Sequence, residues 1–280
     1  MVGEFLERPF PGFQSLNFSA NEGFPSVQPT VQYPNLVELI FRPGDPKITQ
    51  QSEDNLLNLL HNSPNLRAVH LEYQSPTAEY TAGELIKLHS LRTFTQNFRF
   101  EGSETVPLRV FNQLDLPHIL EIALTDHDDR KIRSWDNSFP THHLSRFPNF
   151  NAVKITVPES EYGKVRVEAE FSNTDTRRKI SLNKIVSKEN YSPTIVDEIL
   201  DSLLNRGMDS SVNTLRLRRC LDGGTVPTGI KKWVERIRAL EGSVDLPGRV
   251  TLVTNESYWL GLDESVEELG IQDVVELTIG

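Results

Sequence analysis

The sequence contains a single cysteine, Cys220, among its 280 residues. An internal disulfide is therefore impossible, and a reducing compartment is expected. The first residues show no signal-peptide profile, and no apolar run approaches the length that crosses a bilayer. We therefore expect an intracellular protein, cytoplasmic or nuclear, with no membrane partner.

Positive charge is also scarce. Lys and Arg together number 29 against 39 Asp and Glu, so the formal net charge is −10. Binding to a nucleic-acid backbone needs a basic stripe, and this balance argues against one. Nucleic acid is therefore excluded as the expected main partner.

Motifs of catalysis are missing from the sequence as well. It has no Gly-rich phosphate loop, no Cys-x-x-Cys pair, no Gly-x-Ser-x-Gly elbow and no His-Glu-x-x-His. The nearest approach to a metal cluster is the run from Asp126 to Asp129, with His142 and His143 downstream. A solvated acidic loop is the favoured interpretation, and an enzyme with a site in residues 126–143 stays an alternative. We expect no cofactor, no metal and no catalytic residue.

What the sequence does contain is a repeated phrase: apolar, two variable residues, apolar, one variable residue, apolar. An example is Leu36-x-x-Leu39-x-Phe41, and an imperfect copy places Gln96 where an apolar residue is expected. The end of each phrase has the alternation of a strand. The full copies are residues 13–18, 36–41, 66–71, 119–124, 150–155, 212–217 and 274–279.

Segments between the phrases carry helix signals. Ser192-Pro193 is an N-cap with proline at the first helical position, and Thr81-x-x-Glu84 is a capping box before Leu85, Ile86 and Leu88. Amphipathic spacing predicts further helices over residues 52–60, 230–240 and 263–268. Strand alternation predicts a hairpin at about residues 164–186 and a strand over 249–253.

Strand followed by helix at a repeating interval predicts an α/β fold. One such unit cannot bury its own apolar face, whereas a stack of them shares a continuous core. The predicted architecture is a single irregular solenoid over residues 1–280, curved like a leucine-rich-repeat protein. It has a parallel inner sheet, outer helices and an inserted hairpin at about 164–186.

The phrases resemble the leucine-rich repeat, L-x-x-L-x-L-x-x-N/C-x-L. Asn21 after Phe18, and Cys220 after Leu217, stand at its Asn/Cys position. Runs such as Tyr33-Pro-Asn-Leu and Ser63-Pro-Asn-Leu are similar to the repeat half of fungal F-box proteins. The resemblance implies a non-enzymatic module that recognises the target of an F-box-type ubiquitin ligase. Docking on the ligase scaffold is expected only if an F-box exists upstream of the first repeat.

The residues between the apolar anchors are predicted to point away from the core and to line the concave face. We expect a protein target to bind there. Two alternatives stay open: these residues are only solvated, or the chain is a stand-alone repeat scaffold that binds through its outer helices or the hairpin. The candidate binding residues are Glu38, Arg42, His70, Glu72, Glu121, Lys154, Arg216 and Arg218.

Cys220 itself has two interpretations. It is a reactive thiol beside Arg218 and Arg219, or a buried structural thiol at the interior position of a repeat. The repeat pattern favours the second.

Overall fold

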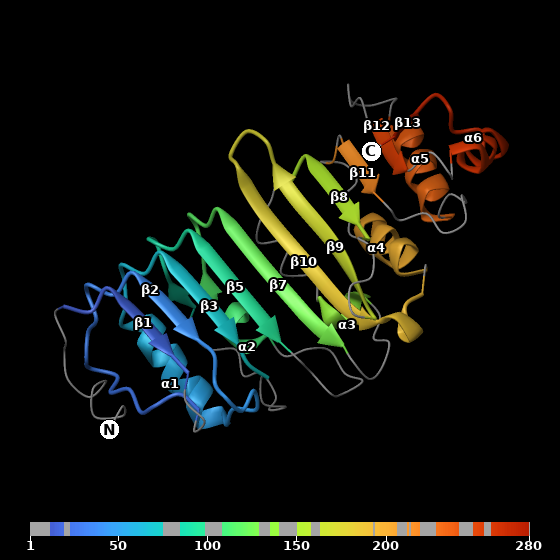
Figure 1. The fold of residues 1–280 in the computed structure, drawn as a ribbon. Helices are drawn as coiled ribbons and strands as arrows, with labels where there is room; N and C mark the ends of the chain where they lie inside the picture. The colour runs from blue at the N-terminus through green and yellow to red at the C-terminus, as the bar shows by residue number, and fades with distance from the viewer. Residues whose placement is uncertain are drawn as a thin grey trace. The chain divides into compact units, whose positions relative to one another are not determined.

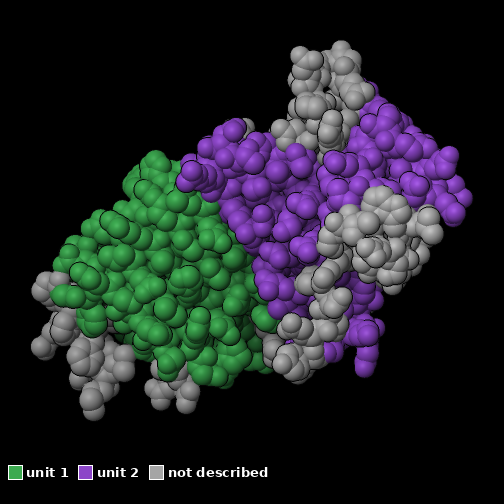
Figure 2. All heavy atoms as spheres, turned by 45° about the horizontal axis from the view of Figure 1, so that its top comes forward, with its two compact units in different colours: residues 1–102, 106–127 green, residues 103–105, 128–280 purple. Residues whose placement is uncertain are grey.

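A computed structural model represents the protein. It describes residues 12–19, 23–74, 85–98, 108–128, 135–139, 150–157, 163–192, 194–205, 212, 214–218, 228–240, 249–254 and 259–279. Cys220 and Asn21 lie outside these residues. The chain divides into two compact units, which Figure 2 distinguishes by colour. Unit 1 comprises residues 1–102 and 106–127, and unit 2 comprises residues 103–105 and 128–280.

Unit 1 contains a parallel run of strands, each at the end of one copy of the repeated phrase. Neighbouring strands are paired in parallel in the order of the chain. The imperfect copy also forms a strand, β5, with Gln96 inside it. The strands are β1 (Ser15–Phe18), β2 (Glu38–Phe41), β3 (Ala68–Glu72), β5 (Thr93–Phe98) and β7 (Glu121–Asp128).

The apolar anchors of these strands form the core of unit 1. Leu39, Phe41, Val69 and Phe94 have no exposed surface, whereas the residues between them are half-buried or exposed. Figure 1 shows α1 (Gln50–His61) along one face of the strands. That helix contributes four buried leucines, at positions 56, 57, 59 and 60. The predicted helix over 52–60 is therefore confirmed, with Thr49 as its N-cap, accepting from the Ser52 N–H at 3.2 Å.

The helix predicted after Thr81-x-x-Glu84 is wrong over the described residues. Ile86–Lys87 is strand β4, paired in parallel with β6 (Leu114–Asp115). The Ile86 N–H donates to the Gln113 carbonyl at 2.7 Å. Burial alternates from Leu85 to Leu88, which is the period of a strand. The pairing partner, which follows α2 (Arg109–Asn112), is distant in sequence and overrides the local helix signal.

Unit 2 combines parallel strands with the predicted hairpin. The strand order is β10-β9-β8-β11-β12-β13, and β8, β11, β12 and β13 are parallel. The hairpin strands β9 and β10 are antiparallel, and β9 also pairs antiparallel with β8. The hairpin is thus confirmed, and it lies within the sheet. The strands are β8 (Ala152–Thr156), β9 (Lys164–Asn173), β10 (Arg178–Ser187), β11 (Thr214–Arg218), β12 (Arg249–Thr254) and β13 (Val275–Ile279).

Helices supply the other part of unit 2, and three of them lie where spacing predicted. Ile199 and Leu200 of α4 are fully buried, as is Val234 of α5, and Trp233 is 1% exposed. No helix in the described part of the chain is long and apolar enough to cross a membrane. The elements are α3 (Trp135–Ser138), the 3₁₀ turn η3 (Lys188–Asn190), α4 (Thr194–Asn205), α5 (Thr228–Leu240) and α6 (Trp259–Glu268). The fold is mixed α/β with mostly parallel strands, as predicted.

Candidate functional site

The strands of unit 1 present polar side chains on the face opposite the buried anchors. We call this the open face of unit 1. Register places Glu38, Ala68, Thr93 and Glu121 in one row across four strands. Ile40, His70 and Thr95 form the next row. Glu38 accepts a hydrogen bond from the Ser15 hydroxyl at 2.9 Å. The structure therefore brings Glu38, His70, Glu72 and Glu121 of the predicted set onto one face.

Arg42 and Glu72 meet at the carboxyl ends of β2 and β3. The Arg42 Nε lies 3.4 Å from a Glu72 carboxylate oxygen, and both side chains are more than half exposed, at 62% and 56%. An ion pair this exposed contributes little to stability. Its charges are available to a partner.

A cavity of about 360 Å³ opens beside this ion pair. Its lining comes from the ends of β2, β3, β5 and β7 and from the loop after β2. In parallel sheets the carboxyl ends of the strands are where ligands commonly bind. The lining residues are Arg42, Pro43, Gly44, Pro46, Glu72, Tyr73, Asn97, Phe98 and His127.

The loop that closes the cavity is built from turn residues. Asp45 accepts a hydrogen bond from the Lys47 N–H at 2.9 Å, and the Gln74 N–H donates to the Pro46 carbonyl at 2.6 Å. The loop is thus tied to the end of β3. Sequence reasoning had selected Arg42 and Glu72 and had placed Asn97 on the concave face, but it missed Tyr73 and Phe98. The Pro43-Gly44-Asp45-Pro46 run was a usable turn signal.

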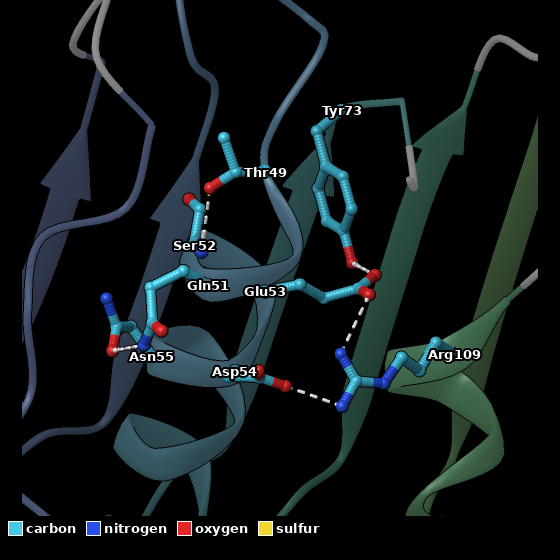
Figure 3. A network of polar contacts seen from close by, with 8 residues as sticks. All are labelled: Thr49, Gln51, Ser52, Glu53, Asp54, Asn55, Tyr73 and Arg109. Carbon is cyan, nitrogen blue, oxygen red and sulfur yellow. Dashed lines mark hydrogen bonds and ion pairs between the residues drawn. The ribbon is translucent and has the colours of Figure 1, made fainter. Parts of the chain in front are cut away.

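A partly buried polar network fixes the Tyr73 wall of the cavity (Figure 3). The Tyr73 hydroxyl donates to Glu53 Oε1 at 3.0 Å. Arg109 Nη1 lies 3.4 Å from Glu53 Oε2, and its Nη2 lies 2.5 Å from Asp54 Oδ1. Glu53 has no exposed surface. Two acidic residues of α1 therefore connect the end of β3 to α2.

Charge states within the network follow from burial and from the neighbours. Burial raises the pKa of Tyr73 well above its usual value, and the charge and hydrogen bond of Glu53 raise it further. Burial lowers the pKa of Arg109, but the hydrogen bond and charge of Asp54, together with Glu53, outweigh this and raise it overall. Tyr73 is therefore neutral and Arg109 charged at neutral pH. The network therefore positions the Tyr73 wall of the cavity.

The acidic run considered as a metal site begins inside strand β7, which includes Asp126, His127 and Asp128, so the predicted solvated loop is wrong over these residues. Asp126 is fully buried, whereas His127 lines the cavity. Asp129, His142 and His143 lie outside the described residues. Among the described residues, no group of three potential ligands is placed to hold a metal ion.

Unit 2 has an open face of its own, which carries the other predicted residues. Lys154 is in register with Arg216, and Thr156 with Arg218. Glu170 of the hairpin stands beside Lys154 and makes a 2.8 Å ion pair with Lys179. The predicted set thus divides into five residues in unit 1 and three in unit 2.

Comparison with known proteins returns no match among family models, curated proteins or solved structures.

Proposed function

We propose that this protein is a non-enzymatic protein-binding module, with leucine-rich-repeat-like units stacked as a curved solenoid. The observation that supports this best is that each strand buries one set of side chains and presents the other set on the open face. Anchors such as Leu39 and Val69 are fully buried, while the intervening residues are half-buried or exposed and mostly polar. An extended polar face of this kind suits a protein or peptide partner.

The cavity of unit 1 supplies an anchor point for that partner. Tyr73, Phe98, Pro43 and Pro46 give it apolar walls, and Arg42 adds charge at the edge. Binding energy in protein interfaces concentrates where one side chain fills a well-packed pocket. A pocket with a fixed wall costs less to order on binding, and Glu53 holds the Tyr73 wall.

The narrower proposal is that the module recognises the target of an F-box-type ubiquitin ligase. Its support is the similarity of the repeat phrases to fungal F-box proteins. The alternative scaffold, binding through the hairpin, is less well supported. Val167 and Phe171 of β9 are fully buried, so the hairpin belongs to the core of the sheet.

The role of the cavity is tested by a substitution that fills it with a large side chain. Asn97 is half-buried and lines the cavity from β5, so Asn97→Trp should occupy the space that a partner side chain would enter. Partners that co-purify with the tagged wild-type protein are quantified by mass spectrometry. We expect at least a tenfold loss of a specific partner in Asn97→Trp, as for a hot-spot position.

The matched control is Lys87→Trp, an exposed position outside the cavity, which should retain that partner. Equal recovery of every partner from the Asn97→Trp protein, with its fold intact by circular dichroism, would contradict the role of the cavity. The same purification from the native locus tests the narrower proposal, because a ubiquitin-ligase scaffold should appear among the partners. Its absence would contradict that proposal alone.

A further inference from the structure

Two cations lie side by side on the open face of unit 2. Lys154 on β8 is in register with Arg216 on β11, and neighbouring strands are about 4.8 Å apart. Their chain neighbours Val153 and Leu215 are buried on the opposite face. Like charges directly opposite one another destabilise a sheet. This pairing therefore works against the stability of the fold.

No carboxylate in the described part of the chain forms an ion pair with either of these two cations. Glu170 is in register with Lys154, but its carboxylate lies 2.8 Å from the Lys179 ammonium group. Among the described residues, neither Lys154 nor Arg216 makes a side-chain hydrogen bond or an ion pair. The open face of unit 1 differs, because Arg42 there faces Glu72 at 3.4 Å.

Register extends the pair into a longer pattern, which we call the charged row. Across five strands it reads Glu170, Lys154, Arg216, Thr251 and Glu276. The charges are therefore negative, positive, positive, neutral and negative. The row spans about 19 Å, which an extended segment of about six residues covers.

We infer that the charged row binds a short segment of a partner protein that has acidic residues at its centre and a basic residue at the end that lies over β13. This inference rests on the proposed protein-binding function and adds the chemistry of the partner. The central carboxylates meet Lys154 and Arg216, and the basic residue meets Glu276, because Glu170 is already paired with Lys179. A nucleic-acid strand fits poorly, because the Glu276 end of the row repels phosphate.

Two capped synthetic peptides of identical composition and zero net charge serve as probes. Lys-Ser-Glu-Ser-Asp-Ser-Lys has the acidic centre, and Glu-Ser-Lys-Ser-Lys-Ser-Asp has the reverse order, and in both the charged side chains share one face of an extended segment. Each is titrated into the full-length ¹⁵N-labelled protein at low salt, where exposed ion pairs are least screened. The acid-centred peptide should bind about fivefold tighter, a difference that two or three exposed ion pairs can supply. The amide shifts should centre on β8 and β11.

Charge variants decide the inference. Lys154→Gln with Arg216→Gln should abolish the preference, and Lys154→Glu with Arg216→Glu should invert it. Arg67→Gln with Lys87→Gln removes the same charge from exposed positions in unit 1 and should leave the preference unchanged. Equal affinity for both peptides, or a preference that survives in the double Gln variant, would overturn the inference but not the binding function. Failure of both peptides to bind every form of the protein would count against the open face itself.

Discussion

Gln96 occupies a position where the repeat calls for an apolar residue. It lies in β5 between Leu71 and Leu124 of the neighbouring strands and has no exposed surface. Neither its amide nitrogen nor its amide oxygen has a hydrogen-bond partner in the described part of the chain. A buried amide without partners costs free energy. The sequence showed the irregularity, but only the structure shows that the side chain points into the core.

We therefore predict that Gln96→Leu stabilises unit 1 by about 1–3 kcal/mol, since it removes the cost of burying two unsatisfied polar atoms. The measurement is native-state hydrogen exchange of the β3 and β5 amides. Thr95→Val, on the open face of the same strand, is the control and should change stability by less than about 0.5 kcal/mol. Faster exchange in Gln96→Leu would contradict the prediction and show that the buried amide stabilises unit 1.

Tyr73 gives a second prediction, on pH dependence. Its pKa is raised in the folded protein above the usual value of 10.0, so the folded state holds the phenolic proton more tightly than the unfolded state. The contribution to stability is complete below about pH 10 and is lost as the pH rises through the folded pKa. Tyr73→Phe cannot titrate and should lack this loss.

The measurement compares the free energy of unfolding of wild-type and Tyr73→Phe proteins from pH 8 to pH 11. At pH 8 the variant should be less stable by about 1–3 kcal/mol, because Glu53 loses a buried donor. The difference should narrow above pH 10. A constant difference over the whole range would contradict the raised pKa of Tyr73.

At the scale of elements, a side chain of α4 caps the N-terminus of α5. The Gly229 N–H, in the first turn of α5, donates to Asp197 Oδ1 on α4 at 2.7 Å. A carboxylate near a helix N-terminus is favoured by the exposed N–H groups and by the helix dipole. Gly229 also approaches α4 closely, because an added Cβ would lie 3.1 Å from Leu200. The contact therefore needs both residues.

We predict that Asp197→Ala destabilises unit 2 by about 1–2 kcal/mol, as for the loss of an N-cap. Asp201 is the matched control, because it lies one turn further along α4 and also reaches α5, through an exposed 2.9 Å ion pair with Lys232. Asp201→Ala should cost less than about 1 kcal/mol. Urea denaturation of both variants checks this, and equal losses would contradict the capping role.

Prediction of the helices and strands from sequence succeeded where the regular spacing of apolar residues continued along the segment. The helices over 52–60, 230–240 and 263–268 and the hairpin at 164–186 are all present. It failed at Ile86–Lys87, where a two-residue pairing with Leu114–Asp115 replaces the expected helix. A capping box acts over four residues. It carries no information about a strand that lies almost thirty residues further along the chain.

At the scale of the whole molecule, the unfolding of the two units can be measured with separate spectroscopic signals. Trp135, Trp233 and Trp259 all belong to the residues of unit 2, so tryptophan fluorescence reports on that unit. The predictions for Gln96 and Tyr73 concern unit 1 and need amide exchange or tyrosine signals. A single denaturation curve is not assumed to be two-state in a chain with two compact units.

The sequence by itself determined the mixed α/β class and most of the strands, because the spacing of apolar residues indicates which side of each strand is buried. It also identified Arg42, Glu72, Lys154 and Arg216 as outward-facing. The tertiary structure alone decided which of these become neighbours, since register between strands depends on pairing across distant parts of the chain. That register produced the Arg42–Glu72 ion pair, the cavity beside it and the like-charged Lys154–Arg216 pair.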